Sequence, residues 1–203
     1  MTAHPATSLH HITALALPGL AITMNTYAAS EGILFDFQAP TSSPAWEIVN
    51  DDVMGGVSTS RFQIRTNGGA VFSGVVSLEN NGGFASVRSS PVRHDLTGCG
   101  CFVIRLRGDG RRYKFTARTE TGFDAPLYQC AFVTKRGEWE EHRLVFKDFV
   151  PTFRGRILTG VPPLNPANVT SVGFLISDQQ AGPFRLEIVS IRAARQPEKP
   201  REP

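Results

Sequence analysis

"CFVIRLRGDGRRYKFTAR", residues 101–118, alternates apolar and polar side chains on both sides of a Gly-Asp-Gly turn. Alternation with a period of two is typical of half-buried β-strands, and a short glycine-containing turn between two such runs predicts an antiparallel hairpin. The register of a two-residue turn places Leu106 opposite Tyr113, so one face of this hairpin is apolar and points toward a core.

The other face of the predicted hairpin is basic. In this register Arg107 faces Arg112, Arg105 faces Lys114 and Cys101 faces Arg118. Like charges directly opposite one another are destabilising, by roughly a few tenths of a kcal/mol per exposed pair. Two explanations stay open. Either Glu138, Glu140 or Glu141 on a neighbouring strand, or water, compensates these cations, or the basic stripe binds a ligand or a protein partner.

The same alternation continues through most of the chain, and no stretch sustains helical spacing. The sequence therefore predicts an all-β fold, an antiparallel two-sheet β-sandwich of jelly-roll type, in one domain over residues 33–194. Further predicted strands are "ILFDF", "RFQIRT", "AVFSGVVSL", "FASVRS", "LYQCAFVT", "EWEEHRLVF", "SVGFLIS" and "PFRLEIVSIRA".

Both ends of the chain differ from this domain. Residues 1–32 form a leader that is disordered or weakly signal-like, and residues 195–203 form a Pro-rich, charged tail that we expect to be disordered. No Lys or Arg precedes Arg61, so the leader lacks the basic residues of a targeting segment. We expect a cytoplasmic protein, or an exported one if residues 1–29 act as a signal. The apolar run in the leader, "HHITALALPGLAITM" (residues 10–24), is too short for a transmembrane segment and is broken by Pro18 and Gly19.

A second informative stretch is "NDDVMGGVSTS", residues 50–60. It does not match an EF-hand, because acids do not alternate through it and no Glu closes it. The main interpretation is a sharply bent turn, and the alternative is a calcium site using Asn50, Asp51 and Asp52. "LENNGGFASVRS", residues 78–89, repeats the Asx-Gly-Gly pattern, so the two corners are predicted to share one rim of the sandwich.

Catalytic motifs are not evident in the sequence. Outside the leader the histidines are His94 and His142, and neither lies near a recognisable nucleophile or orienting acid. There is no P-loop and no dinucleotide-binding glycine motif, so we expect no cofactor, no metal and no enzymatic activity. A net charge of +3 without interleaved aromatic residues also argues against nucleic acid as a partner.

Five motifs, taken in order, resemble the complex I intermediate-associated protein 30 family. They are "WEIVNDDVMGGVS", "FSGVVSLENNGGFASVR", "RGDGRRYKF", "DFVPTFRGR" and "SVGFLISDQQAGPFRLEI". The resemblance covers roughly residues 33–194 and implies a galactose-binding-like jelly roll. It also implies a non-catalytic assembly factor whose partners are subunits or intermediates of respiratory NADH:ubiquinone oxidoreductase.

Matching these motifs places the candidate binding residues in the rim loops, on the basic face and in "DFVPTFRGR", which Pro151 and Gly155 predict to be an irregular loop. Phe84 and Phe153 could instead close the ends of the sandwich. Trp46 and Trp139 are interpreted as core residues, and Asp178 and Gln179 as turn residues. The candidate binding residues are Asn50, Asp51, Asp52, Met54, Gly55, Gly56, Asn80, Asn81, Gly82, Gly83, Phe84, Arg105, Lys114, Arg118, Phe153, Arg154 and Arg156.

Two functions follow as hypotheses. The first is a non-enzymatic binding or assembly-factor domain that holds a protein partner through the rim loops and the basic face. The second is a module similar to carbohydrate-binding modules that holds a glycan on the concave sheet. The absence of a clear run of Trp or Tyr on the predicted basic face favours the first.

Overall fold

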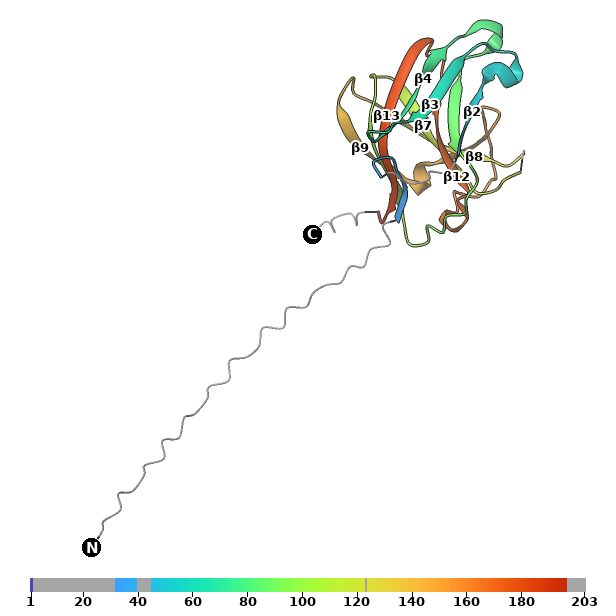
Figure 1. The fold of residues 1–203 in the computed structure, drawn as a ribbon. Helices are drawn as coiled ribbons and strands as arrows, with labels where there is room; N and C mark the ends of the chain where they lie inside the picture. The colour runs from blue at the N-terminus through green and yellow to red at the C-terminus, as the bar shows by residue number, and fades with distance from the viewer. Residues whose placement is uncertain (2–31, 40–44, 123, 197–203) are drawn as a thin grey trace, which may run out of the picture.

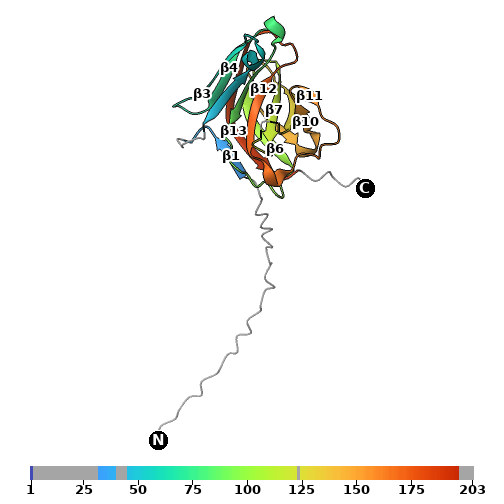
Figure 2. The ribbon, with the colours of Figure 1, turned by 90° about the vertical axis from the view of Figure 1, so that its right-hand side faces the viewer.

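The computed structural model describes Met1 and residues 32–39, 45–122 and 124–196, and in this part of the chain two antiparallel sheets pack face to face (Figures 1 and 2). The predicted all-β sandwich is thereby confirmed. The leader and the tail lie almost entirely outside the described residues. Sheet A has the order β3 (Thr59–Ile64), β4 (Ala70–Val76), β13 (Gly182–Ala194), β6 (Cys101–Arg107) and β9 (Trp139–Val145), with β1 (Gly32–Asp36) pairing the second half of β13.

Sheet B and four short 3-10 helices complete the described fold. Sheet B has the order β11 (Arg156–Ile157), β10 (Val150–Phe153), β8 (Leu127–Val133), β7 (Arg112–Arg118), β12 (Ser171–Ile176), β5 (Ala85–Ser89) and β2 (Trp46–Asn50). The 3-10 helices are η1 (Asp51–Met54), η2 (Glu79–Asn81), η3 (Phe146–Asp148) and η4 (Pro166–Asn168). In Figure 1, η1 and η2 lie at the end of the sandwich away from β1 and the last residues of β13.

The core fills the space between the inner faces of the two sheets. Phe102 of sheet A and Phe115 of sheet B are both fully buried, and their ring centroids lie 5.0 Å apart. Trp46 packs over Phe62 with ring centroids 4.6 Å apart, as expected for a core residue. The alternation in the sequence therefore identified the inward side chains correctly.

The predicted hairpin at residues 101–118 is wrong. β6 pairs with β13 and β9 in sheet A, whereas β7 pairs with β8 and β12 in sheet B, so the chain crosses from one sheet to the other at residues 108–111. The Asp109 carboxylate holds this crossing: it accepts hydrogen bonds from the nearby Tyr113 hydroxyl (3.0 Å) and from the distant Arg185 N–H on β13 (2.9 Å). A local turn signal cannot reveal such distant partners, which here determine where each strand pairs.

The crossing separates the predicted basic face into two parts. Arg105 lies in sheet A in register with Glu141, and Lys114 lies in sheet B with its Nζ 2.6 Å from Asp178 Oδ1. The like charges therefore never face one another. The register places Glu141 on the strand beside Arg105, which agrees with the explanation that a neighbouring strand supplies carboxylates.

The segment "DFVPTFRGR" is also more regular than predicted. β10 and β11 form a short hairpin, with Arg154 (φ 48°) and Gly155 (φ 77°) in its turn. Pro151 is tolerated because β10 is a short strand near the edge of sheet B, where a missing N–H is least costly.

Candidate functional site

The two Asx-Gly-Gly corners meet at the Asp51 carboxylate, which is fully buried. Its Oδ1 accepts the Ser58 N–H (2.9 Å), and its Oδ2 accepts the N–H groups of Gly83 (2.7 Å) and Phe84 (3.2 Å). The predicted common rim is thereby confirmed. We define the rim as residues 51–58 and 78–84.

Two glycines in the rim leave room for this carboxylate. A Cβ on Gly56 would lie 2.4 Å from Asp51 Cγ, and a Cβ on Gly82 would lie 2.6 Å from Asp51 Oδ2. Both distances are shorter than van der Waals contact, so a side chain at either position would displace Asp51. Gly55 has a different role, because its φ of 90° is a backbone conformation that glycine adopts without strain.

The environment of Asp51 favours its ionised form. Burial alone would raise the pKa of this carboxyl, but the hydrogen bonds from Ser58, Gly83 and Phe84 outweigh burial and lower the pKa below its ordinary value. Asp51 is therefore an anionic acceptor that joins two loops separated by about thirty positions in the chain.

The calcium alternative finds no support in this geometry. Asp51 already accepts bonds from protein groups, and the Asn50 Oδ1 accepts the Ser60 hydroxyl at 2.7 Å. Asp52 is exposed. Among the described residues no three His, Cys, Asp or Glu side chains gather as a metal site would require.

The rim exposes four apolar side chains beside its exposed polar residues. Val53 is 69% exposed, Met54 60%, Val57 47% and Leu78 45%. Sequence reasoning identified Met54 and missed the other three. Their positions in the sequence could have indicated this exposure. Each lies in or beside a sharp turn, outside the alternating strands, where no strand periodicity directs an apolar side chain toward the core.

The remaining rim residues shape the second corner. Asn80 (φ 55°) and Asn81 (φ 59°) adopt left-handed conformations and are exposed, while Phe84 is half-buried. Asp178 (φ 62°) and Gln179 (φ 59°) also adopt this conformation, which confirms their prediction as turn residues.

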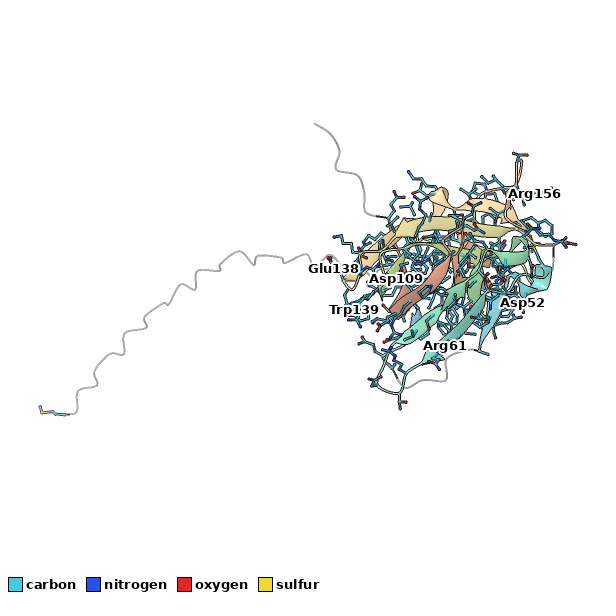
Figure 3. All side chains as sticks on the ribbon, turned by 90° about the horizontal axis from the view of Figure 1, so that it is seen from above. Asp52, Arg61, Asp109, Glu138, Trp139 and Arg156 are labelled. Carbon is cyan, nitrogen blue, oxygen red and sulfur yellow. The ribbon has the colours of Figure 1, made fainter. Side chains whose placement is uncertain are left out.

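The other predicted binding residues do not join the rim. Phe153, Arg154 and Arg156 belong to the β10–β11 hairpin at one edge of sheet B, whereas η1 follows β2 at the opposite edge. Figure 3 labels Arg156 and Asp52 at separate places on the surface. One contiguous site containing all the candidate residues is therefore excluded.

Lys114 and Arg118 lie on the outer face of sheet B. The Arg118 Nη1 donates to the Ala125 carbonyl (3.3 Å), and its Nε has no hydrogen-bond partner among the described residues. Burial, with the nearby Arg88, lowers the pKa of Arg118. Arg105 lies on sheet A and shares no surface with these two residues.

Sequence reasoning missed a larger group of arginines on the outer face of sheet A. Arg65, Arg107 and Arg185 all pair with Glu187, and Arg107 also lies over the ring of Trp139 at 4.8 Å. Trp139 is 47% exposed, so its prediction as a core residue is wrong. The three arginines come from β6, β13 and the end of β3, and only their pairing across strands brings them together.

Residues 35–188 match the family model described as Complex I intermediate-associated protein 30 (CIA30). A relative from Drosophila melanogaster, "Complex I intermediate-associated protein 30, mitochondrial", is 31% identical over 180 residues, which cover 77% of this chain and 60% of the relative. The relative of the same name from Mus musculus is 26% identical, with 77% of this chain and 54% of the relative covered. The chain thus spans little more than half the length of these relatives.

These relatives contradict the expected cytoplasmic or exported location. Their names state that they are mitochondrial, which points to a mitochondrial location instead. The expectation relied on the lack of basic residues before Arg61, and residues 2–31 lie outside the described part of the chain. In the described part, no helix combines the length and apolar character needed to span a membrane.

Solved structures resemble the chain in fold alone. The family 11 carbohydrate-binding module of a cellulosomal cellulase from Clostridium thermocellum superposes with a TM-score of 0.60 at 14% identity, covering 82% of this chain and 95% of the module. An agarase superposes with a TM-score of 0.56 at 14% identity, covering 82% of this chain and 25% of the agarase. The galactose-binding-like β-sandwich is therefore confirmed.

Proposed function

The chain belongs to the complex I intermediate-associated protein 30 family, and from this premise we propose that it is a binding domain that holds a protein partner in respiratory-complex assembly. The observation that carries the proposal is the set of exposed apolar side chains on the rim. Exposed apolar patches on a globular domain mark interaction surfaces, and Met adapts well to varied partners.

The rim suits this role because its backbone is fixed before a partner arrives. Asp51 and the short bonds it accepts order both loops, so Val53 and Met54 lose little additional freedom when they become covered. A few apolar anchors on such a scaffold supply most of the binding energy in many interfaces. The candidate residues Asn80, Asn81 and Phe84 would contact the same partner from the second corner.

The proposal assigns no catalytic residue. His94 lies edge-on to Phe35 at 6.0 Å, and His142 lies against Phe132 at 5.0 Å. Each imidazole is thus packed against an aromatic ring. We infer a binding role without catalysis, and without a cofactor or metal.

Site-specific crosslinking tests the proposal. A photo-crosslinking residue at Met54 should capture a respiratory-complex subunit or assembly intermediate in mitochondrial extract, and Val53→Glu should abolish the capture. Ile157→Glu is the matched control, because Ile157 is 71% exposed on β11, away from the rim. The proposal fails if nothing above background is captured, or if both substitutions reduce capture equally.

A glycan on the outer face of sheet B is the second candidate. The polar side chains of Thr116 and Gln129 lie side by side there and favour it. Against it, the outward positions of the described sheet B strands carry no Trp, Tyr or Phe on which a sugar ring could stack. A glycan array without signal at millimolar ligand would remove this candidate.

A further inference from the structure

The outer face of sheet A carries more positive charge than its own carboxylates neutralise. Glu187 accepts Arg65 Nη1 at 3.2 Å, Arg107 Nη2 at 3.0 Å and Arg185 Nε at 3.1 Å. Burial would raise the pKa of Glu187, but the bonds from Arg107 and Arg185 outweigh burial and lower it, so the carboxylate is ionised at neutral pH. One negative charge thus holds three guanidinium groups in place.

A fourth arginine extends this group. Arg61 on β3 and Arg185 on β13 both lie in register with Ser73 on β4, which places them on one row of the same face. They line an open depression of about 460 Å³ together with Thr59, Ser73 and Val75, and its lining contains no carboxylate. Arg61 makes no ion pair with any described residue.

Neighbouring acids do not balance this charge. Within this group, four arginines and one glutamate leave a net charge of three positive. Asp109 interacts with Arg111 and Tyr113 at the sheet crossing, Glu138 pairs with Lys135, and Glu141 pairs with Arg143 and Arg192. Each of these acids already has a cation or hydroxyl of its own.

A second depression lies on the other side of Glu187. It has a volume of about 200 Å³ and is lined by Arg65, Arg107, Trp139 and Glu187 among others. The two depressions extend from β3 at one edge of sheet A to β9 at the other, which is about 19 Å at the usual strand spacing. Figure 3 labels Arg61 and Trp139 on one flank of the molecule and Arg156 on the opposite one.

We infer that this arginine face, formed by Arg61, Arg65, Arg107 and Arg185 around Glu187, docks an extended acidic segment of a partner protein. Its length fits several negative charges in succession, and guanidinium groups held in fixed orientation suit two-oxygen recognition of carboxylates. An anionic membrane is disfavoured, because the arginines line depressions around a carboxylate, which suit an extended chain better than a broad, flat anionic surface. Charge complementarity thus selects the acidic segment.

This inference deepens the proposed function and rests on it. The arginine face adjoins the rim, since Thr59 directly follows Ser58, and Val75 stands three positions before Leu78. A partner that covers Val57 and Leu78 can therefore continue over Arg61 without a gap. Its matching surface is apolar at the rim and acidic along sheet A.

Fluorescence anisotropy with a labelled oligoglutamate peptide tests the inference at about 0.15 M salt, where exposed charges are substantially screened. The double variant Arg61→Gln, Arg185→Gln should bind at least about tenfold more weakly than the unchanged chain, as expected for about 1.4 kcal/mol of lost interaction. The control Arg88→Gln, Arg156→Gln removes the same charge from sheet B. Arg88 pairs with Glu47, and Arg156 makes no ion pair with any described residue. This control should weaken binding by less than about twofold.

Three outcomes would overturn the inference: no peptide binding, equal losses in the two double variants, or binding to phosphatidylserine vesicles without binding to the peptide. Thermal unfolding of both variants checks that they remain folded. The peptide assay needs no natural partner, so it can fail while Met54 crosslinking succeeds. Conversely, Val53→Ala, which shortens a rim side chain without adding charge, should leave peptide affinity unchanged, which separates this inference from the proposed role of the rim.

Discussion

Two aspartates in glycine-rich turns, Asp51 and Asp109, illustrate how similar sequence patterns serve different purposes. Both accept hydrogen bonds from distant segments of the chain. Asp51 is fully buried and accepts from two loops that together form the rim. Asp109 is partly exposed and accepts from Tyr113 and Arg185 where the chain crosses between the sheets.

The difference in burial determines how much each aspartate contributes to stability. If the Asp51 carboxylate is removed, the N–H groups it satisfied lose their acceptor in a place that water cannot easily reach. If the Asp109 carboxylate is removed, water can replace it. The comparison therefore predicts a ranked series of effects on stability, which the following substitutions test.

The largest effect is expected for Asp51→Ala. Loss of an acceptor shared by Ser58, Gly83 and Phe84 should lower the free energy of unfolding by about 4 kcal/mol, from roughly 1–3 kcal/mol per unsatisfied buried group. Chemical denaturation measures it. Asp52→Ala removes the same charge from an exposed neighbour and should change stability by less than about 0.5 kcal/mol. Equal effects would show that the buried carboxylate has no special role.

A smaller effect is expected for Gly82→Ala. The added Cβ would meet Asp51 Oδ2 at 2.6 Å, and overpacking of this kind costs about 1–3 kcal/mol. The backbone of Gly82 has a negative φ, so the strain would be steric and not conformational. Gly122→Ala is the control, because nothing lies within 4 Å of its added Cβ. An unchanged unfolding midpoint for Gly82→Ala would mean that the rim is looser than described.

Asp109→Ala should cost about 1 kcal/mol for its two hydrogen bonds together, because solvent reaches this side chain and can replace part of each. The Tyr113 hydroxyl loses its acceptor, and burial together with Asp109 already raises the pKa of that phenol far above its ordinary value. Denaturation of the variant, compared with Asp51→Ala in the same buffer, measures the ratio of the two effects. A larger loss for Asp109→Ala would reverse the ranking.

The smallest effect is the pH dependence that Asp51 contributes. Its pKa is lower in the folded chain than the ordinary value of 3.8, so its contribution is fully present above pH 3.8 and is lost as the pH falls through the folded pKa. The unchanged chain should therefore lose stability below pH 3.8 more steeply than Asp51→Ala does. If the unchanged chain and Asp51→Ala lose stability equally as the pH falls below 3.8, the lowered pKa of Asp51 is contradicted.

The sequence predicted the fold class well because burial on one face imposes a period of two on strands such as β5 and β8. It failed at residues 101–118, where alternation identified the inward residues Phe102 and Phe115 but not the sheet to which each belongs. Alternation reports the face of a strand, whereas pairing depends on distant groups such as Arg185 and Gln180.

The candidate site was predicted in part for the same reason. The repeated Asx-Gly-Gly corners indicated a shared rim, but the sequence does not show that Asp51 points inward while Val53 and Met54 point outward. The arginine face could not be predicted at all, because Arg61 and Arg185 become neighbours only through β4.

Amide hydrogen exchange of Ser58 and Gly83 measures whether one buried carboxylate fixes the rim. Both amides lie outside the strands and donate to Asp51. We predict exchange nearly as slow as that of core-strand amides such as Phe72, and fast exchange after Asp51→Ala. Exchange of Ser58 and Gly83 at the rate of unprotected peptide, in the unchanged chain near neutral pH, would contradict the account.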